Sequence, residues 1–376
     1  MQGAMTSTVL RQNNRRRIYQ YIYESPQPVT KQDVARALEL SMPTVSSNLQ
    51  DFLSEGLLSY TGTLASTGGR KPRVISLVSD ARFSVGLSIM DNALRLTAVD
   101  LKTQELAQQK IFLPFAHTPA YYTQVSQLVE AFLDAHPLPR EKMLGLGITF
   151  PGIVDREQQR LIFAPTLGLR DVSLEEIRPY FDRYPLFIEN DANASGYAES
   201  WLRKSTRNLV YLSVERGVGG ALFFNSGRYT GDNGRSGEFG HIRLVPGGRL
   251  CRCGRHGCLE AYCSTSRLSD DLDITLEEFF TMLDNGNDQI ALTWQRYLSH
   301  LTDGLAMIRM ALDCDIVLGG MLAAHLEKHL DTIRREVCRK TLFDHNGDFL
   351  TLDMFRANGA CVGAALHHVN DFLSSF

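Results

Sequence analysis

The sequence predicts an α/β protein preceded by a small helical domain that ends in a β-hairpin. Two observations support this class: helical patterns followed by a hairpin pattern up to about residue 78, and alternating strand and helix patterns from residue 81 onward. The chain has 376 residues, of which 44% are hydrophobic and 22% charged, so we expect a globular protein of two or three domains.

Two amphipathic helices are expected near the start of the chain. The first covers RRRIYQYIYES at residues 15–25, and the second covers TKQDVARALEL at residues 30–40. Thr30 is suited to the N-cap of the second helix, and Asp33 at the third position makes a weak form of the capping box.

A third helix is expected directly afterwards, in SMPTVSSNLQDFLSEG at residues 41–56. Ser41 can cap its start, and Pro43 suits the first turn. One face repeats apolar residues at helical spacing, namely Val45, Leu49, Phe52 and Leu53. The opposite face is expected to carry short hydrogen-bonding side chains, namely Thr44, Ser46, Ser47, Asn48 and Gln50. Such side chains can contact base edges and phosphates when a helix lies in the major groove of DNA.

A β-hairpin pattern follows, with strands at 57–63 and 73–78 joined by LASTGGRKP at 64–72. Three helices followed by this hairpin predict a winged helix-turn-helix, with a basic wing carrying Arg70, Lys71 and Arg73. Residues 1–80 hold nine basic and six acidic residues, a balance of +3 in a chain of net charge −3. This modest asymmetry has the sign expected for binding nucleic acid. The alternative is a helical protein-interaction module whose polar face is only solvated.

From residue 81 onward, strand and helix patterns alternate as in α/β proteins. We expect successive antiparallel strands at 83–90, 93–101 and 110–115, a helix at 119–136, and strands at 143–150 and 185–191. Later elements are expected as a helix at 194–202, a strand at 208–214, a glycine-rich segment at 216–231, and a strand at 315–320 after a long helix ending near Asp313.

The loop CRCGRHGCLE at residues 251–260 places three of the seven cysteines within eight positions. Such a cluster in a reducing compartment favours a zinc site, with Cys251, Cys253 and Cys258 as three of four ligands. The candidates for the fourth are His241, His256 and Cys263, of which we prefer His241 because a strand-like segment precedes it. Four protein ligands leave no open coordination position, so the zinc is expected to be structural. The alternative is three unrelated buried cysteines.

Other features of the sequence exclude some classes of protein. No apolar run reaches the roughly 18 to 20 residues of a membrane span, and the first residues lack the apolar core of a signal peptide. The remaining cysteines Cys314, Cys338 and Cys361 are widely separated, which favours reduced thiols. We therefore expect a cytoplasmic protein without a disulfide framework.

Taken together, these motifs resemble the ROK family, whose members are repressors, open reading frames and kinases, and most of all its transcriptional regulators. The resemblance is carried by STGGRKP, GITFPGIVD, ENDANASGYAE, ERGVGGALFFNSGRYTGDNGRSGEFGH, CRCGRHGCLE and LGGMLA. It implies an actin-like, ribonuclease H-like body of two lobes behind the winged helix-turn-helix. The implied division is a DNA-binding domain at 1–80, a first lobe at 81–189 completed by 360–376, and a second lobe at 190–359.

The resemblance also implies which residues bind ligands. The histidine of the GE-x-GH motif and the three loop cysteines would bind one zinc, which corresponds to His241, Cys251, Cys253 and Cys258. The residues implied around a sugar are Asn190, Asp191, Glu238, His241 and Glu260. Carboxylates and amides suit this role because a buried polar group left unmatched costs roughly 1 to 3 kcal/mol, which discriminates between sugar epimers. The alternative for the two glutamates is a surface ion pair or a solvated loop end.

In family kinases the aspartate of the ND pair is the catalytic base, a position held here by Asp191. The glycine-rich phosphate loops of the kinases differ in this chain, however. The first hairpin of the body has Leu87, Ile89 and Met90 in place of a glycine pair, and the second phosphate loop carries Glu215, which would repel a triphosphate. The sugar loop APTLGLR also departs from the family pattern at Thr166 and Leu169. We therefore expect the catalytic role of Asp191 to be vestigial.

The sequence thus predicts a sugar-responsive transcriptional regulator, most simply a repressor released from its operator by a sugar or sugar phosphate. Its expected partners are double-stranded operator DNA, the sugar effector and further copies of the chain in a homodimer or homotetramer, without a membrane. The alternatives are a sugar kinase with a DNA-binding head and a regulator controlled by a protein partner.

Overall fold

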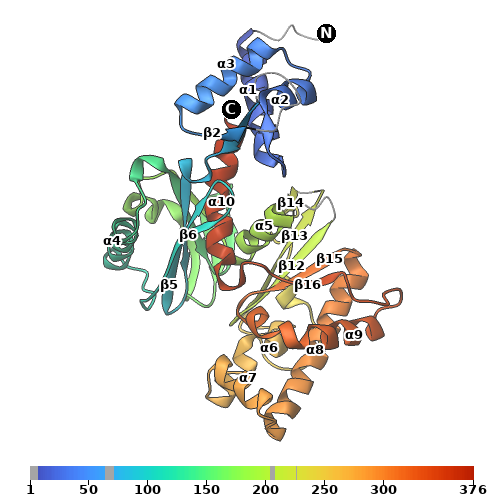
Figure 1. The fold of residues 1–376 in the computed structure, drawn as a ribbon. Coiled ribbons are helices and arrows are strands. Elements are labelled where there is room, and N and C mark those ends of the chain that lie inside the picture. The colour runs from blue at the N-terminus through green and yellow to red at the C-terminus, as the bar shows by residue number, and fades with distance from the viewer. Residues whose placement is uncertain (1–6, 64–71, 204–207, 226) are drawn as a thin grey trace.

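The computed structural model describes residues 7–63, 72–203, 208–225 and 227–376. Within these residues, a small N-terminal part with its own three-stranded sheet precedes two five-stranded sheets and a further three-stranded sheet. Figure 1 shows the N-terminal part at one end of the molecule and the two large sheets following it.

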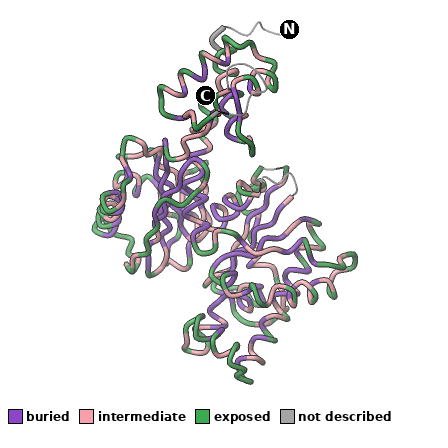
Figure 2. The backbone as a smooth tube through the Cα atoms, in the orientation of Figure 1, coloured by how far each residue is buried: buried purple, intermediate pink, exposed green. Residues whose placement is uncertain are grey.

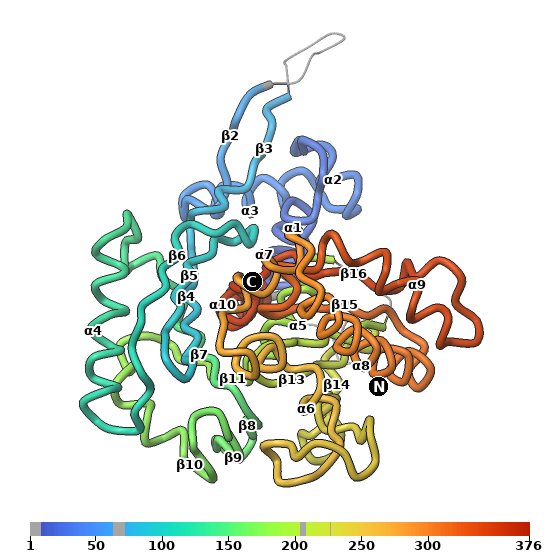
Figure 3. Tube along the Cα trace, turned by 90° about the horizontal axis from the view of Figure 1, so that it is seen from below, coloured from blue at the N-terminus to red at the C-terminus, as the bar shows by residue number. Residues whose placement is uncertain are grey.

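The N-terminal part consists of three helices and a three-stranded antiparallel sheet. The helices are α1 (Ser7–Glu24), α2 (Lys31–Leu38) and α3 (Met42–Ser54), and the sheet has the order β1 (Val29–Thr30), β3 (Arg73–Leu77) and β2 (Leu58–Thr63). Figure 3 shows β2 and β3 extending away from the large sheets. The three predicted helices and the hairpin are confirmed, whereas the two-residue strand β1 was not expected.

Side chains at the helix starts explain where α2 and α3 begin. The hydroxyl of Thr30 accepts a hydrogen bond from the backbone N–H of Asp33 (3.4 Å), and the Asp33 carboxylate accepts one from the backbone N–H of Thr30 (3.0 Å). The predicted capping box is therefore confirmed. Ser41 caps α3 by accepting from the N–H of Thr44 (3.3 Å), and Pro43 lies in the first turn as expected.

The first large sheet has the order β11–β7–β4–β5–β6. Its strands are β4 (Phe83–Ile89), β5 (Ala93–Asp100), β6 (Glu105–Phe112), β7 (Met143–Phe150) and β11 (Leu186–Asn190), and the last two run parallel to β4. Helix α4 (Pro119–Ala135) contributes Tyr121, Val125 and Phe132 to the core of this sheet. Strand β6 begins at Glu105, before the predicted range 110–115. The sequence did not indicate this start because the strand lies at the edge of the sheet, is mostly exposed and shows little alternation of apolar residues.

A smaller three-stranded sheet, in the order β10–β9–β8, is attached to the same lobe. Its strands are β8 (Ile153–Asp155), β9 (Arg160–Ala164) and β10 (Leu169–Ser173). Their buried residues belong to the core of the first large sheet.

The second large sheet has the order β14–β13–β12–β15–β16. Its strands are β12 (Leu209–Val214), β13 (Val218–Phe224), β14 (Gly227–Tyr229), β15 (Asp315–Gly319) and β16 (Leu350–Leu352). The helices of this lobe are α6 (Glu260–Cys263), α7 (Leu276–Asp284), α8 (Asp288–Leu312) and α9 (Leu330–Lys340). Figure 2 shows buried residues concentrated along the strands of both large sheets. Within the described residues, no helix is both long and apolar enough to cross a membrane.

Two helices lie between the large sheets and connect them. Helix α10 (Gly359–Ser374) packs on the first sheet, and helix α5 (Asp191–Arg203) packs on both α10 and the second sheet (Figure 1). Their axes approach closely because small residues face each other: a Cβ atom at Gly363 would lie 1.7 Å from the carbonyl oxygen of Ala194. Any larger residue at Gly363 would therefore separate the two helices.

The last residues of the chain pack into the N-terminal part. The ring centroid of Phe376 lies 4.5 Å from that of Tyr19 in α1 and 5.5 Å from that of Phe52 in α3. Phe372 at the end of α10 lies 5.0 Å from Phe376 and belongs to the same apolar cluster. Helix α10 thus runs from the region between the two sheets to the core of the N-terminal part.

Candidate functional site

A cavity of about 310 Å³ lies where the two large sheets face each other. It is lined by all five residues that were predicted to contact a sugar, namely Asn190, Asp191, Glu238, His241 and Glu260. The first two come from the junction of β11 and α5. Of the other three, Glu238 and His241 lie at a 3₁₀ turn, Phe239–His241, and Glu260 begins α6. The site is therefore assembled from segments that are distant in the sequence.

Asn190 and Asp191 are held firmly at the start of α5. The amide nitrogen Nδ2 of Asn190 donates to the carbonyl oxygen of Gly152 (2.6 Å) and to Oδ1 of Asp191 (3.0 Å). The same Asp191 oxygen accepts from the backbone N–H of Ala192 (2.8 Å). Burial and the neighbouring Glu215 carboxylate raise the pKa of Asp191 to about 7. Protonated and ionised forms of Asp191 are therefore both populated near neutral pH.

The second lobe contributes two carboxylates to the cavity. Glu238 directly precedes the 3₁₀ turn Phe239–His241, and its Oε2 lies 3.8 Å from Nε2 of His241. Glu260 begins α6, and its Oε2 accepts a hydrogen bond from the backbone N–H of Val218 (3.0 Å). Burial raises the pKa of Glu238 above its ordinary value. These oxygens line the same cavity as Asp191 and can accept hydrogen bonds from ligand hydroxyls.

The predicted metal ligands His241, Cys251, Cys253 and Cys258 come together beside this cavity. One donor atom from each lies within 4.8 Å of all the others, with Nδ1 of His241 3.8 Å from Sγ of Cys251 and the sulfurs of Cys253 and Cys258 3.7 Å apart. Four ligands around zinc with Zn–S bonds of about 2.3 Å have sulfurs separated by roughly 3.8 Å, so this donor set fits a tetrahedral ion. Nδ1 of His241 thus faces the metal site while Nε2 faces Glu238.

The other two candidates for the fourth ligand are excluded by their positions. His256 is exposed, with Nδ1 2.9 Å from the carbonyl oxygen of Gly248, and Cys263 is fully buried in the core of the second lobe. His241 is the last residue of a 3₁₀ turn, Phe239–His241, whereas a strand was expected before it. The loop itself requires glycine at Gly257, where φ is +84° and a Cβ atom would lie 1.8 Å from the carbonyl oxygen of Val245.

Two hairpin turns face each other at another side of the cavity, and an ion pair joins them. Arg216 lies between β12 and β13, and its Nη1 is 3.6 Å from Oδ2 of Asp91, which lies between β4 and β5. Its Nη2 lies 2.6 Å from Oδ2 of Asp270. These turns correspond to the predicted phosphate loops. An ion pair between two partly exposed side chains therefore joins these two turns.

The neighbouring Glu215 is enclosed at the same place, and burial raises its pKa while the Arg95 guanidinium opposes the rise. The first hairpin holds Leu87, Ile89 and Met90 as predicted, but Leu87 and Ile89 lie in its first strand and not in its turn. Both are fully buried in β4, and of the three bulky residues only Met90 belongs to the turn and lines the cavity. The residues of the turn itself, between Ile89 and Ala93, make it unlike a glycine-rich phosphate loop. The apolar residues of the preceding strand do not.

Several cavity residues were not identified from the sequence, namely Arg95, Lys110, Phe112 and Ser213. A cation within the apolar strand ALRLTAVD was the available signal for Arg95. In the APTLGLR loop, Thr166 lines the cavity, whereas Leu169 is buried at the start of β10. Only Thr166 of this predicted pair can therefore contact a ligand.

The predicted DNA-contacting residues of α3 do not all lie on one exposed face. Ser47 is exposed, and Thr44 and Ser46 are half-buried, with the Ser46 hydroxyl donating to the carbonyl oxygen of Met42 (2.5 Å). Asn48 is only 5% exposed, and its Nδ2 donates to the carbonyl oxygen of Thr44 (2.8 Å). The placement of Asn48 on the exposed face was therefore wrong.

The predicted wing residues lie at the edge of what the structure describes. The Arg73 guanidinium lies 3.7 Å from the ring centroid of Tyr60 on β2, which holds it against the hairpin. Arg70 and Lys71 lie outside the described residues.

Comparison with known proteins identifies relatives among both regulators and kinases. A xylose repressor of Bacillus spizizenii is 29% identical over 247 residues, which is 65% of this chain and 64% of that protein. The DNA-binding transcriptional dual regulator NagC of Escherichia coli is 25% identical over 264 residues, which is 69% of this chain and 64% of NagC. The chain thus spans slightly less than two thirds of the length of these curated relatives.

Solved structures extend the similarity to the whole fold. A ROK family transcriptional regulator described as a homologue of the E. coli MLC protein covers 97% of this chain and 98% of its own, with a TM-score of 0.75 at 19% identity. A ROK family glucokinase from Streptomyces griseus, in complex with glucose and AMPPNP, covers 76% of this chain and 98% of its own, with a TM-score of 0.66 at 22% identity. At these sequence identities, the structural similarity shows a shared fold.

The model of the ROK family matches residues 84–368, which include both large sheets and the cavity between them. This match covers well over half of the chain. The protein therefore belongs to the ROK family, and its body has the actin-like fold of that family.

Proposed function

We propose that this chain is a sugar-responsive, DNA-binding transcriptional regulator, most simply a repressor of carbohydrate uptake or metabolism genes. A bound sugar or sugar phosphate would release it from its operator. The observation that carries this proposal is the combination of a carboxylate-lined cavity with an N-terminal part of three helices and a hairpin. Relatives named as a xylose repressor and as a DNA-binding transcriptional dual regulator support the same function.

The N-terminal part, residues 1–80, is proposed to be a winged helix-turn-helix with α3 as the recognition helix. Thr44, Ser46 and Ser47 would contact bases or phosphates near the start of α3, without Asn48, which is buried. The wing residues Arg70, Lys71 and Arg73 would contact backbone phosphates.

The body is proposed to bind the sugar and one structural zinc ion. Its two lobes would be residues 81–189, completed by 360–376, and residues 190–359, a division that the two separate sheets support. When bound, zinc would supply a fixed positive charge that holds the loop and the His241 ring in place. His241 would then present Nε2 to the cavity, where Glu238 and Glu260 accept hydrogen bonds from sugar hydroxyls.

Helix α10 is proposed to couple the sugar site to the DNA-binding part. Asn358 at its start accepts a hydrogen bond from Arg95 (3.0 Å), which lines the cavity, and Phe376 beyond its end packs against Tyr19 and Phe52. A sugar that prefers one arrangement of the lobes can thereby change the position of α1 and α3. By linkage, sugar lowers DNA affinity by the same factor that DNA lowers sugar affinity. A homodimer or homotetramer would set the spacing of two such parts on an operator.

The alternative of a sugar kinase is favoured by one observation, the pKa of Asp191 near 7, which suits a general base. Phosphoryl transfer also needs a place for the nucleotide phosphates. Asp91 and Glu215 instead place two carboxylates at the turns where those phosphates would lie, which disfavours a nucleotide there. The regulator is therefore the better supported function.

Mobility shifts with operator fragments, in the presence of aldoses, N-acetylhexosamines and their 6-phosphates, test the proposal. We expect one sugar class to release the protein, and removal of residues 1–78 to abolish DNA binding. Glu260→Ala should retain DNA binding but lose the response to sugar, since the two sites lie in different parts of the chain. DNA binding that persists without residues 1–78 would contradict the assignment.

A further inference from the structure

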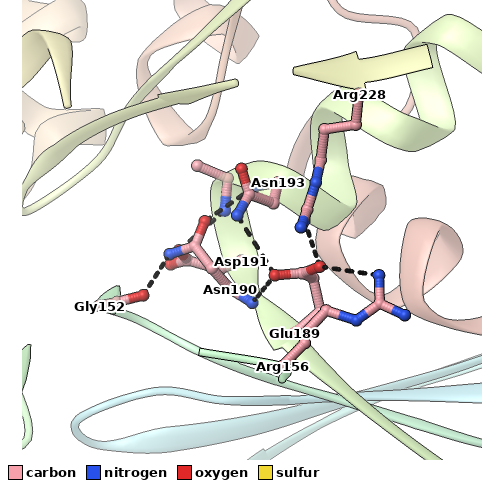
Figure 4. A network of polar contacts seen from close by, with 8 residues as sticks. Gly152, Arg156, Glu189, Asn190, Asp191, Asn193 and Arg228 are labelled. Carbon is pink, nitrogen blue, oxygen red and sulfur yellow. Dashed lines mark hydrogen bonds and ion pairs between the residues drawn. The ribbon is translucent and has the colours of Figure 1, made fainter. Parts of the chain in front are cut away.

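Glu189 is a buried carboxylate that lies directly behind the sugar-binding pair but does not line the cavity. It is 3% exposed, on β11, one residue before Asn190 (Figure 4). Its Oε1 accepts hydrogen bonds from the backbone N–H of Asn190 (2.8 Å) and from Nδ2 of Asn193 (3.2 Å). One oxygen of Glu189 therefore fixes the segment that carries Asn190 and Asp191.

The other oxygen of Glu189 binds two guanidinium groups of unequal importance. Arg228 on β14 donates directly to Oε2, and its side chain is 21% exposed. Arg156, after β8 in the same lobe as Glu189, approaches the same oxygen only to 3.9 Å and is 43% exposed. Arg156 is also held by the Phe187 ring, 4.7 Å from its guanidinium carbon. Arg228 is thus the principal counter-charge, and it belongs to the other large sheet.

We propose that Arg228 is a positioning residue for the sugar site, acting from the second lobe through Glu189. A buried carboxylate is costly without a close counter-charge, so loss of Arg228 would favour rotation of the Glu189 side chain away from its present position. Such a rotation weakens the hydrogen bonds that Oε1 accepts from Asn190 and Asn193. This role goes beyond the proposed function, although its consequence for sugar binding rests on it.

Because Arg228 and Glu189 lie on different sheets, their contact exists only while the lobes keep this arrangement. The half of the site at the end of β11, Asn190 and Asp191, is therefore ordered by a residue of the sheet whose lobe supplies Glu238 and Glu260. Both halves of the site become ordered together when the lobes meet. A ligand that bridges the halves would in turn stabilise the Arg228–Glu189 contact.

Hydrogen exchange of the ligand-free, zinc-containing full-length protein tests this inference. The reporters are the backbone amides of Ala192 and Asn193, which donate to Asp191 and Asn190 (2.8 Å each). In Arg228→Gln these amides should exchange on the order of 10- to 100-fold faster, because a buried charged partner is lost. In the matched control Arg156→Gln, which removes an exposed and more distant guanidinium from the same oxygen, the increase should be at most about fivefold.

Arg228→Lys should lie between wild type and Arg228→Gln, since it keeps the charge but not the planar fork. The amides of β15, remote from Glu189, should stay within about twofold of wild type. Equal effects of the two glutamine variants, or acceleration of all segments by one factor, would overturn the inference. The measurement uses neither sugar nor DNA, so its failure is distinct from failure of the proposed function.

Discussion

The contact between Phe376 and the N-terminal part gives a quantitative prediction for Phe376→Ala. The Phe376 ring lies 4.5 Å from Tyr19, 5.5 Å from Phe52 and 5.0 Å from Phe372, measured between centroids. Complete burial of a phenylalanine is typically worth about 3 to 5 kcal/mol on truncation to alanine. Because Phe376 is partly exposed, we expect a loss of about 2 kcal/mol in the local stability of α1 and α3, in line with three aromatic contacts of about 0.5 to 1.5 kcal/mol each.

Hydrogen exchange followed by mass spectrometry can measure this loss. Since each 1.4 kcal/mol corresponds to a factor of ten, 2 kcal/mol predicts amides in α1 and α3 that exchange about 30-fold faster. Phe343→Ala is the matched control, because Phe343 is 76% exposed and its truncation should change stability by less than about 0.5 kcal/mol. Unchanged exchange in α1 and α3 of Phe376→Ala would refute the argument that α10 couples the two parts.

Three further predictions concern the body of the protein. In Cys253→Ala, elemental analysis should find the bound zinc lowered from about one ion per chain toward none. The second lobe should also lose stability, because structural zinc binding contributes to folding. A zinc-free wild type prepared without chelators would contradict this prediction. Sugar affinity measured by calorimetry should increase as pH rises through about 7 and then level off. The reason is that sugar hydroxyls donate more strongly to the ionised carboxylate of Asp191, whose pKa is raised to about 7. Asp191→Asn should remove this pH dependence. Incubation with magnesium, ATP and the releasing sugar should give no sugar phosphate, whereas turnover at an ordinary kinase rate that is lost in Asp191→Asn would favour the kinase.

The sequence predicted best those features whose partners are close in the chain. Cys251, Cys253 and Cys258 lie within eight positions, so their spacing alone indicated a metal site, and the structure brings them together with His241. The helix caps at Thr30 and Ser41 were likewise predictable, because each involves a residue three positions away.

The misplacement of Asn48 has a simple geometric origin. Asn48 is three residues after Val45 and four before Phe52, so on a helix it lies on the same side as these two buried residues. Its polar side chain suggested the opposite face. The structure satisfies its Nδ2 with the carbonyl oxygen of Thr44, which allows the amide to be buried.

Contacts between distant segments could not be predicted from a single sequence. Nothing in the local pattern indicates that Glu189 meets Arg228, that Asp91 meets Arg216, or that Phe376 packs near Tyr19. Each contact depends on how the two lobes and the N-terminal part are placed relative to one another. These contacts are also the ones that connect the sites, so the coupling is the least predictable property of the chain.

Among the described residues, two ion pairs that join the lobes differ in burial, and this difference bears on how the body can open. Asp91 and Arg216 have side chains that are 37% and 44% exposed, whereas Glu189 and Arg228 are 4% and 21% exposed. Separating the exposed pair costs at most about 1 kcal/mol, while leaving a buried carboxylate unpaired costs several times more. Opening that breaks Asp91–Arg216 and retains Glu189–Arg228 is therefore the motion of lowest cost. Such a motion would widen the cavity at the Arg216 side while the Asn190–Asp191 segment stays ordered. A sugar that binds the open or the closed arrangement of the lobes only slightly more tightly could then shift the balance between the two arrangements.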